Sequence, residues 1–429
     1  MIAQRLAEFS AIQSLPRPAM DVMRLSLLDW CAVGVAGRDE PVAKILRDQA
    51  VEEGGAPQAA LIGSNVRIPA RAAALVNGAT SHALDYDDTH FAHIGHPSVA
   101  VLPAALATAQ LCNASGQALQ EAALIGAEAS IRVGLWLGRA HYQAGFHQTA
   151  TAGAFGACLS ACRLLGLDLA QTVLALGLVS TRASGLKSQF GTMGKPMNAG
   201  IAAANGVEAA LLAQRGFVSR DDALDGLQGF GPTHHGEGSE SAWDGLGQSW
   251  LFETVSHKFH ACCHGLHAML EALTPQIGIP VHDIDRVEIM THSRWLSVCN
   301  IEVPKTGLEA KFSYRLTAAM RLAGYDTSLP DSFNDRLCRD ESLVALRDRV
   351  RVSAQETLSE MQAHVVLHTI HGTKHELTHD LDAPLPYADR EVRLRAKATA
   401  LIGLDRAEKL WRMISDAAPP DTIASAISN

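Results

Sequence analysis

Residues 82–98 of the chain read His82-Ala-Leu-Asp85-Tyr-Asp87-Asp88-Thr89-His90-Phe-Ala-His93-Ile-Gly-His96-Pro97-Ser98. This stretch places three carboxylates and four imidazoles between two apolar runs with helical spacing. Burial and mutual proximity of so many titratable groups separate their pKa values, which acid–base catalysis requires. The sequence therefore predicts a catalytic loop between two helices.

An exposed polar loop with a helix cap is the alternative interpretation, because Asp, Thr and Ser are ordinary cap residues. For any single Asp or His of this stretch, that simpler interpretation is the stronger one. The density of histidines in the whole stretch favours catalysis, since loops on a rigid scaffold are where functional side chains gather.

Length and composition indicate more than one domain. The chain has 429 residues, of which 47% are hydrophobic, and this is longer than one hydrophobic core usually supports. We therefore expect two domains, one of them discontinuous. Only 19% of the residues are charged and 5% are aromatic. A composition this rich in Ala, Leu and Gly suits closely packed helices.

The charge and the cysteines exclude several classes of protein. A formal net charge of −9 without a basic tract argues against nucleic acid binding. The eight cysteines include no CxxC pair, so we expect reduced thiols rather than a disulfide framework. The first residues do not resemble a signal peptide, and no apolar run reaches the roughly 18 residues that span a bilayer. We therefore expect a cytoplasmic protein without membrane contact.

Apolar residues at helical spacing predict a long series of helices before residue 215. The expected helices cover residues 19–36, 40–54, 70–83, 99–112, 118–137, 150–165 and 169–184, and a last one ends near residue 213. Residues 59–65 suggest a short extended piece. The charged residues Glu121, Glu128 and Arg132 interrupt one apolar run, and we expect them to face solvent. Residues 219–247 are polar and rich in glycine, which suggests a surface excursion.

The pattern changes near residue 280. Alternation of apolar and polar residues predicts strands near 286–292, 350–353, 363–370 and 374–379, with a helix over 310–322. Residues 389–416 return to helical spacing. We therefore predict a mainly α fold, with a large all-helical domain and a smaller α+β domain. The expected boundaries are 1–257 and 389–429 for the helical domain and 258–388 for the α+β domain.

A glycine-rich loop covers residues 185–200 and contains Lys187 and Lys195. It is not a Walker P-loop, because Pro196 stands where that motif needs Ser or Thr. No strand precedes the loop, so a dinucleotide-binding motif is unsupported. Backbone N–H groups and Lys195 just ahead of a helix N-terminus suit a substrate carboxylate. A tight glycine turn with a solvated lysine is the alternative.

Residues 254–267 combine a lysine with several histidines and two adjacent cysteines. Cys262 and Cys263 cannot both bind one metal ion comfortably, and no second cluster has the spacing of a structural zinc site. We therefore expect no metal here, and we interpret Lys258 and the histidines as a second wall of the same site. A role in packing suffices for the two cysteines.

Five segments of the chain resemble the MmgE/PrpD family, in the same order and over nearly the whole length. They are residues 82–98, Gly145-Phe-His147, Gly191-Thr-Met-Gly-Lys195-Pro, residues 258–267 and Ala310-Lys-Phe-Ser313. The family includes 2-methylcitrate dehydratase, cis-aconitate decarboxylase and iminodisuccinate epimerase, which act on small polycarboxylates. The resemblance implies a helical domain built from both chain ends, an α+β lid, an active site in the cleft, a homodimer, and neither a metal nor an organic cofactor.

The resemblance also assigns the site residues by position. It implies catalytic roles for Asp85, His96, His147, Lys195 and Lys258. It implies substrate binding by Thr89, His93, Met193, His260 and Lys311.

One departure from the family pattern bears on the reaction. Members with the decarboxylase pattern have a Tyr three residues after the Ser of the Ala-x-Phe-Ser motif. This chain has Leu316 there, and its nearest tyrosine is Tyr314. We therefore expect an epimerase of the iminodisuccinate epimerase type. A dehydratase resembling 2-methylcitrate dehydratase is one alternative, and a non-catalytic polycarboxylate-binding protein is another.

The chemistry shared by the family members removes a proton from the carbon α to a carboxylate, while cationic groups stabilise the developing negative charge. We expect His96 or His147 to be the general base and Asp85 to orient a histidine. Lys195 and Lys258 would bind substrate carboxylates. An epimerase needs acid–base groups on opposite walls, whereas a dehydratase needs one group to protonate a leaving hydroxyl, and the sequence supplies candidates for either.

Overall fold

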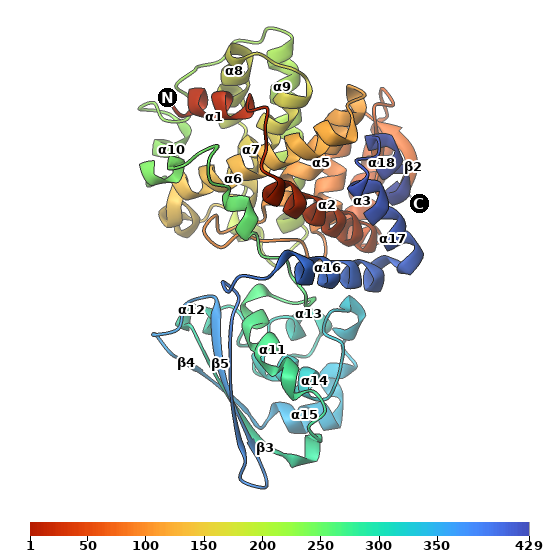
Figure 1. Cartoon of the computed structure of the whole chain (residues 1–429), viewed down its shortest axis with the longest axis vertical. Helices are drawn as coiled ribbons and strands as arrows, with labels where there is room; N and C mark the ends of the chain where they lie inside the picture. The colour runs from red at the N-terminus through yellow and green to blue at the C-terminus, as the bar shows by residue number, and fades with distance from the viewer. Residues whose placement is uncertain (429) are drawn as a thin grey trace. The chain divides into compact units, whose positions relative to one another are not determined.

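The computed structural model describes residues 1–428, which divide into two compact units (Figure 1). The first unit comprises Met1–His257 and the chain from Glu391 onward, and the second comprises Lys258–Arg390. The first unit is helical apart from one small hairpin, and the second combines helices with a four-stranded sheet. The prediction of a mainly α fold with a smaller α+β part is confirmed.

The helices at residues 2–10, 230–233 and 420–428 were not predicted, whereas the other helices of the first unit lie near predicted positions. The first unit contains the following helices. They are α1 (Ile2–Ser10), α2 (Arg17–Gly37), α3 (Pro41–Glu53), α4 (Ala70–His82), α5 (Pro97–Leu111), α6 (Gly116–Ala144), α7 (Gln148–Leu164), α8 (Leu169–Ser180), α9 (Gly194–Gln214), α10 (Phe230–Thr233), α16 (Tyr387–Ile402), α17 (Leu404–Ser415) and α18 (Pro420–Ser428). Short 3-10 turns are η1 (Lys187–Gln189), η2 (Glu240–Trp243) and η3 (Leu251–Thr254). Among residues 1–428, no helix is long and apolar enough to cross a membrane.

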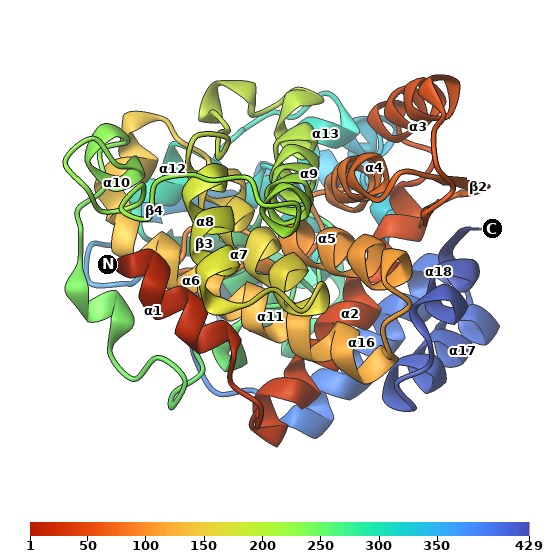
Figure 2. The same cartoon turned by 90° about the horizontal axis from the view of Figure 1, so that it is seen from above.

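The core of this unit is organised around α7, which packs against α5, α6 and α9 (Figure 2). The α4 and α9 helices cross very closely, because two glycines face each other at the crossing. A Cβ atom on Gly78 would lie 2.8 Å from the Cα of Gly200, and one on Gly200 would lie 2.2 Å from the carbonyl oxygen of Leu75. This crossing holds the C-terminus of α4 and the N-terminus of α9 in one rigid core.

Several local expectations for the first unit need correction. Residues 59–68 form an antiparallel hairpin, β1 (Ala59–Leu61) and β2 (Ser64–Ile68), rather than one extended piece. The last helical region is two helices, because Gly403 adopts a φ of 81° between α16 and α17. The region 219–247 is not wholly a surface excursion, since Phe230 and Trp243 are buried in the core.

Glu128 and Arg132 were expected to face solvent, and this prediction is wrong. Both side chains are buried in α6 and form an ion pair with an N–O distance of 2.7 Å. Arg132 also donates to the carbonyl oxygens of Ala242 and Ser249, while the Glu128 carboxylate accepts from the backbone N–H of Phe252. Burying both charges is tolerated because their hydrogen bonds are satisfied.

The second unit contains a sheet in the order β4-β3-β5-β6, in which β3 pairs in parallel with β4 and antiparallel with β5. Its strands are β3 (Ile284–Thr291), β4 (Val350–Ala354), β5 (Gln362–Thr369) and β6 (Lys374–Asp380). Its helices are α11 (His267–Leu273), α12 (Ser293–Leu296), α13 (Gly307–Ala310), α14 (Tyr314–Leu322) and α15 (Glu341–Arg347). Its 3-10 turns are η4 (His264–Leu266), η5 (Thr274–Gln276), η6 (Val281–Asp283), η7 (Pro330–Ser332) and η8 (Leu337–Arg339). All four predicted strands are present.

The helix expected over residues 310–322 is interrupted. Ser313 caps α14 by accepting a hydrogen bond from the backbone N–H of Leu316, so α14 begins only at Tyr314. Lys311 therefore lies in the turn between α13 and α14 rather than within a helix.

Candidate active site

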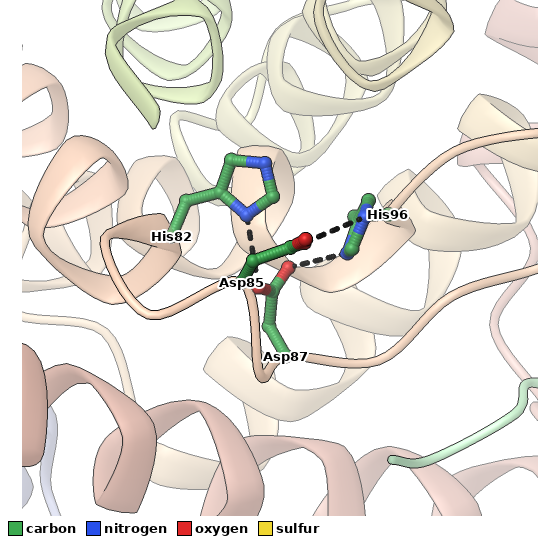
Figure 3. A group of neighbouring side chains, drawn as sticks. All are labelled: His82, Asp85, Asp87 and His96. Carbon is green, nitrogen blue, oxygen red and sulfur yellow. Dashed lines mark hydrogen bonds and ion pairs between the residues drawn. The ribbon is translucent and has the colours of Figure 1, made fainter. Parts of the chain in front are cut away.

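The carboxylate of Asp87 lies between two imidazole rings in the loop that joins α4 to α5 (Figure 3). Its Oδ1 atom lies 2.8 Å from Nδ1 of His82, and its Oδ2 atom lies 2.8 Å from Nδ1 of His96. All three side chains are buried. Burial opposes ionisation of Asp87, but the charges of His82 and His96 and their hydrogen bonds hold its pKa well below the ordinary value. Asp87 is therefore an ionised acceptor for both rings.

A second carboxylate, Asp85, lies on the other side of His96. Its Oδ1 atom is 3.4 Å from Nε2 of His96 and 2.6 Å from Nζ of Lys195, which stands in the first turn of α9. Asp85 has a φ of 51°, an uncommon conformation that Asp tolerates better than most residues. We call the group of His82, Asp85, Asp87, His96 and Lys195 the Asp87 network.

His147 adds a third imidazole next to this network. It stands just before α7, is buried, and its ring stacks on that of His82 with a centroid distance of 6.2 Å. Its Nδ1 atom lies 3.2 Å from the amide nitrogen of Asn198, which can only donate. Burial, followed by the charges of Lys195 and His82, lowers its pKa well below the ordinary value. His147 is therefore neutral, with its proton on Nε2.

Buried polar contacts hold the backbone of the loop. Thr89 and Ser256 exchange backbone hydrogen bonds of 2.9 and 2.8 Å. Nζ of Lys397 donates to the carbonyl oxygen of Tyr86 at 2.7 Å and pairs with the carboxylate of Asp29 at 2.6 Å. Lys397 and Asp29 are both buried. The loop is thus tied to α2, to α16 and to the segment that follows η3, which gives the Asp87 network a rigid support.

Four members of the network also form a possible metal-ligand set. His82, Asp85, Asp87 and His96 each place one ligand atom within 4.8 Å of the others. Imidazole and carboxylate groups are ligands of Zn²⁺ and other divalent transition metals. The same residues also contact one another and Lys195 through a hydrogen bond and ion pairs, so the group can equally act as a proton-binding network.

Comparison with known families decides the relationship of the chain to other proteins. Residues 2–240 match the family model of the MmgE/PrpD N-terminal domain, and residues 260–408 match that of the MmgE/PrpD C-terminal domain. The chain belongs to the MmgE/PrpD family. The resemblance seen in the sequence is thereby confirmed.

Three similar proteins illustrate the MmgE/PrpD relationship. The cis-aconitate decarboxylase-like protein oryM of Aspergillus oryzae is 28% identical over 370 residues, which cover 78% of this chain and 75% of that protein. The cis-aconitate decarboxylase of Aspergillus terreus is 30% identical over 280 residues, or 61% of this chain and 57% of that enzyme. The human cis-aconitate decarboxylase is 24% identical over 376 residues, covering 82% and 77%.

The structure brings together four of the five residues to which the MmgE/PrpD resemblance assigns catalysis: Asp85, His96, His147 and Lys195. The fifth, Lys258, is buried within the second unit. His82 and Asp87, which lie in the same group, were not predicted as site residues, because the orienting role was expected of Asp85. A signal was present, since His82 ends α4 directly before the acidic loop and Asp87 lies five residues later.

The expected substrate-binding residues of the first unit have different surroundings. Thr89 is half-buried, and its hydroxyl lies 3.5 Å from the carbonyl oxygen of Ser256. Met193 is 52% exposed just before α9. His93 is fully buried, and within residues 1–428 neither ring nitrogen has a hydrogen-bond partner. Its ring fills the space beside Gly134, where a Cβ atom would lie 2.1 Å from Nδ1. The substrate-binding role expected for His93 stays a prediction.

The remaining expected ligands belong to the second unit of this MmgE/PrpD protein. His260 is buried, and its ring nitrogens lie 2.7 Å from the hydroxyl of Thr327 and 3.2 Å from the carboxylate of Glu271. These contacts hold His260 within its segment, and its expected role in substrate binding stays a prediction. Lys311 is half-buried, with Nζ 6.0 Å from the ring centroid of Phe333.

The buried carboxyl of Asp88 gives the loop a distinctive pH dependence. Burial raises its pKa to about 7 from an ordinary value of 3.8, although the hydroxyl of Ser98 lies 2.5 Å from Oδ2. Between these two values the folded state binds a proton that the unfolded state has released, so the contribution of Asp88 to stability falls as the pH rises. Asn cannot ionise, so the Asp88→Asn variant should not lose stability in this way as the pH rises.

We therefore expect the stability of Asp88→Asn, relative to the wild type, to rise with pH between about 4 and 7, by at most about 1.4 kcal/mol per pH unit. Urea unfolding of both proteins across this range measures the difference. Buried histidines such as His90, whose pKa burial lowers to about 4, act in both proteins and cancel in the comparison. A difference that stays constant with pH would contradict the prediction.

Proposed function

We propose that this MmgE/PrpD protein is an enzyme that removes a proton from the carbon α to a carboxylate of a small polycarboxylate. The observation that carries the proposal is the ionised Asp87, which holds the imidazole of His96 through Nδ1 while Asp85 and Lys195 lie at its Nε2 side. A histidine oriented by a buried carboxylate, beside a lysine, is a suitable arrangement for general base catalysis with stabilisation of an anion.

We assign the role of general base to His96. A carboxylate can only accept, so Asp87 fixes the proton of neutral His96 on Nδ1 and leaves the Nε2 lone pair for the substrate. When Nε2 takes the substrate proton, the imidazolium lies between two carboxylates, Asp87 and Asp85. His147 is a poor candidate for the base, because its Nδ1 already accepts from Asn198 and its pKa is strongly lowered.

Lys195 and His147 are the groups that we expect to stabilise the negative charge on the substrate carboxylate. The ammonium group of Lys195 is carried by the first turn of α9, where the helix dipole also favours an anion. Lys195 would exchange its ion pair with Asp85 for one with the substrate. Neutral His147 offers its Nε2–H as a hydrogen-bond donor, and a neutral imidazole is an effective donor to a developing oxyanion.

Among reactions that begin in this way, we favour epimerisation. The only tyrosine near the family's Ala-x-Phe-Ser motif in this chain, Tyr314, is buried, and its hydroxyl donates to the carbonyl oxygen of Gly265 at 2.6 Å. That phenol is therefore engaged in the second unit, and the position three residues after Ser313 holds the buried Leu316. Reprotonation of the opposite face requires a second group that carries a transferable proton, and the ammonium group of Lys195, which pairs with Asp85 beside His96, is such a group.

A lyase reaction is the second candidate. The similar proteins named above are cis-aconitate decarboxylases or resemble them. This relationship favours a lyase reaction, which forms or breaks a bond next to the carbon that loses its proton. A dehydratase would use the same base, and the proton that His96 takes from the carbon would pass to the leaving hydroxyl. From the family resemblance we further propose a cytoplasmic homodimer that needs no cofactor, in which Lys258 and Lys311 bind substrate carboxylates.

Proton NMR in deuterated water tests the proposal. The purified protein is incubated with iminodisuccinate, 2-methylcitrate, citrate and cis-aconitate in turn, with and without a chelator. We expect chelator-resistant deuterium incorporation with inversion in iminodisuccinate, because abstraction by one group and return by another exchanges the α proton with solvent. An alkene formed from a hydroxy acid, or loss of CO₂ from cis-aconitate, would support the lyase candidate. A ligand that binds but never exchanges would contradict catalysis.

A further inference from the structure

Two cysteine side chains of the second unit meet at unusually close range. The Sγ atoms of Cys263 and Cys299 lie 3.1 Å apart, and both residues are reduced in this structure. Carbon atoms in contact are about 3.5–4.0 Å apart, and sulfur is larger than carbon. A disulfide bond is about 2.05 Å long. The two thiols therefore need to approach by only about 1 Å to become bonded.

The backbone holds both cysteines in these positions. The N–H group of Cys263 donates to the carbonyl oxygen of Lys311 at 3.0 Å. The N–H group of Cys299 donates to Trp295 at 2.7 Å, and its carbonyl oxygen accepts from Tyr314 at 3.1 Å. Each cysteine thus sits on a segment that is anchored by its own backbone hydrogen bonds, so the fold brings the two side chains together.

We propose that Cys263 and Cys299 form a reversible regulatory disulfide when the protein meets a hydroperoxide. Cys263 reacts first: its thiolate sulfur attacks the peroxide oxygen, the O–O bond breaks, and a sulfenic acid forms together with hydroxide or, from an organic hydroperoxide, an alkoxide. This anion takes up the proton that the Cys263 thiol had released. The thiol of Cys299 then displaces water from the sulfenic sulfur and loses its proton as the S–S bond forms. In total, two thiols are oxidised, one hydroperoxide is reduced to water and an alcohol or a second water, and no other reactant is needed.

The order of the two steps follows from the surroundings of each thiol. Cys263 is only partly buried, whereas Cys299 is fully buried. The hydrogen bond with Cys263, followed by burial, raises the pKa of the Cys299 thiol well above its ordinary value. A protonated and buried thiol reacts slowly with peroxide, since the thiolate is the nucleophile. Cys299 is accordingly the resolving residue and Cys263 the reactive one.

The chain also contains a matched control pair. Cys158 and Cys162 lie one turn apart in α7, with their Sγ atoms 4.0 Å apart. Both are fully buried, and burial raises the pKa of Cys158 well above its ordinary value. The two sulfur atoms of this pair are close together, but their burial keeps the oxidant away from them. We expect it to stay reduced under conditions that oxidise Cys263 and Cys299.

The disulfide would act on catalysis through the segment that precedes it. Cys263 follows Lys258 by five residues, and its backbone contacts that of Lys311, so both residues proposed as carboxylate ligands adjoin the bond. This step rests on the proposed function. A displacement of about 1 Å in a substrate-positioning group can lower the rate by about a hundredfold. We therefore expect the oxidised protein to lose at least about nine-tenths of its kcat/KM.

Mass spectrometry tests the modification without reference to activity. The protein is treated with a small excess of hydrogen peroxide, blocked with N-ethylmaleimide, and digested without reductant. We expect a peptide pair linked by Cys263 and Cys299, its disappearance after dithiothreitol, and full alkylation of Cys158 and Cys162. The link should be absent in Cys263→Ser and retained in Cys158→Ser. Unchanged alkylation of Cys263 in the wild type, or a link to another cysteine, would overturn the proposal.

Activity measurements on the same samples separate the two proposals. A reduced protein without activity, in which the disulfide still forms, would contradict the proposed function and leave the modification standing. A reduced protein with activity that is unchanged by the disulfide would overturn the regulatory role. We expect dithiothreitol to restore the activity of the oxidised wild type, and we expect Cys263→Ser to be insensitive to peroxide.

Discussion

Replacement of Asp87 by Asn is expected to lower kcat/KM by about 10³- to 10⁴-fold, the range found when the orienting carboxylate of a catalytic histidine becomes an amide. Asn has one acceptor oxygen, whereas the carboxylate of Asp87 serves both His82 and His96 at 2.8 Å. If its NH₂ group faces His96, Nδ1 must accept, and the proton moves to Nε2. The general base is then lost although the side chain keeps its shape.

The measurement is the rate of substrate turnover or of α-proton exchange, compared at several pH values. Asp88→Asn is the matched control, since Asp88 is the next residue, is equally buried, and carries the raised pKa of an acid that is already largely protonated below pH 7. We expect the control to keep its activity within about tenfold. Thermal unfolding checks that Asp87→Asn is folded. Activity within tenfold of the wild type in Asp87→Asn would contradict the role of Asp87.

Local sequence patterns were sufficient to predict most of the helical framework. The helices α2 to α9 lie close to the predicted ranges, although α6 continues to Ala144 instead of ending at residue 137. The ranges were predictable because a helix that buries one face must repeat its apolar residues every three or four positions. The strands of the second unit followed from their alternation in the same way. The breaks in these patterns were harder to predict: the cap at Ser313 and the left-handed Gly403 each divide one expected helix.

The buried ion pair of Glu128 and Arg132 shows why some contacts could not be predicted from sequence patterns. Charged residues within an apolar helix usually face solvent, and this expectation failed because a distant segment satisfies both charges. The partners of Arg132 and Glu128 lie 110 to 124 residues further along the chain. Such partners have no local signal, since they are brought together only by the tertiary fold.

The candidate site was only partly predicted, because the contacts of its side chains also depend on the tertiary fold. The loop and the lysine that approaches it, Lys195, could be predicted because both lie next to helix termini. The orienting role was expected of Asp85, whereas the carboxylate nearer to His96 is that of Asp87, because spacing alone does not show which of several carboxylates points toward a ring. The left-handed conformation at Asp85 changes the direction of the backbone before Asp87, which lies close to His82 at the end of α4.

Replacement of Lys195 by Ala is expected to lower kcat/KM by at least about a hundredfold, the effect of removing one group that stabilises an oxyanion. Lys195 is 18% exposed and pairs with Asp85, so its ammonium group is held beside His96 before substrate arrives. If Lys195 stabilises charge mainly in the transition state, kcat should fall. If it binds the carboxylate equally in the ground state, KM should rise with kcat unchanged. Initial rates over a range of substrate concentrations separate the two effects.

Two further variants show whether the effect belongs to this lysine. Lys187 lies in the same loop, but its Nζ donates to the carbonyl oxygen of Tyr142 and lies 3.7 Å from the centroid of that ring. Lys187→Ala should therefore keep its activity within about tenfold. Lys195→Arg keeps the charge and should recover part of the loss, although a planar guanidinium presents its donors differently. Equal losses in Lys187→Ala and Lys195→Ala would indicate that the loop needs positive charge in general, and would contradict a specific bond from Lys195 to the substrate carboxylate.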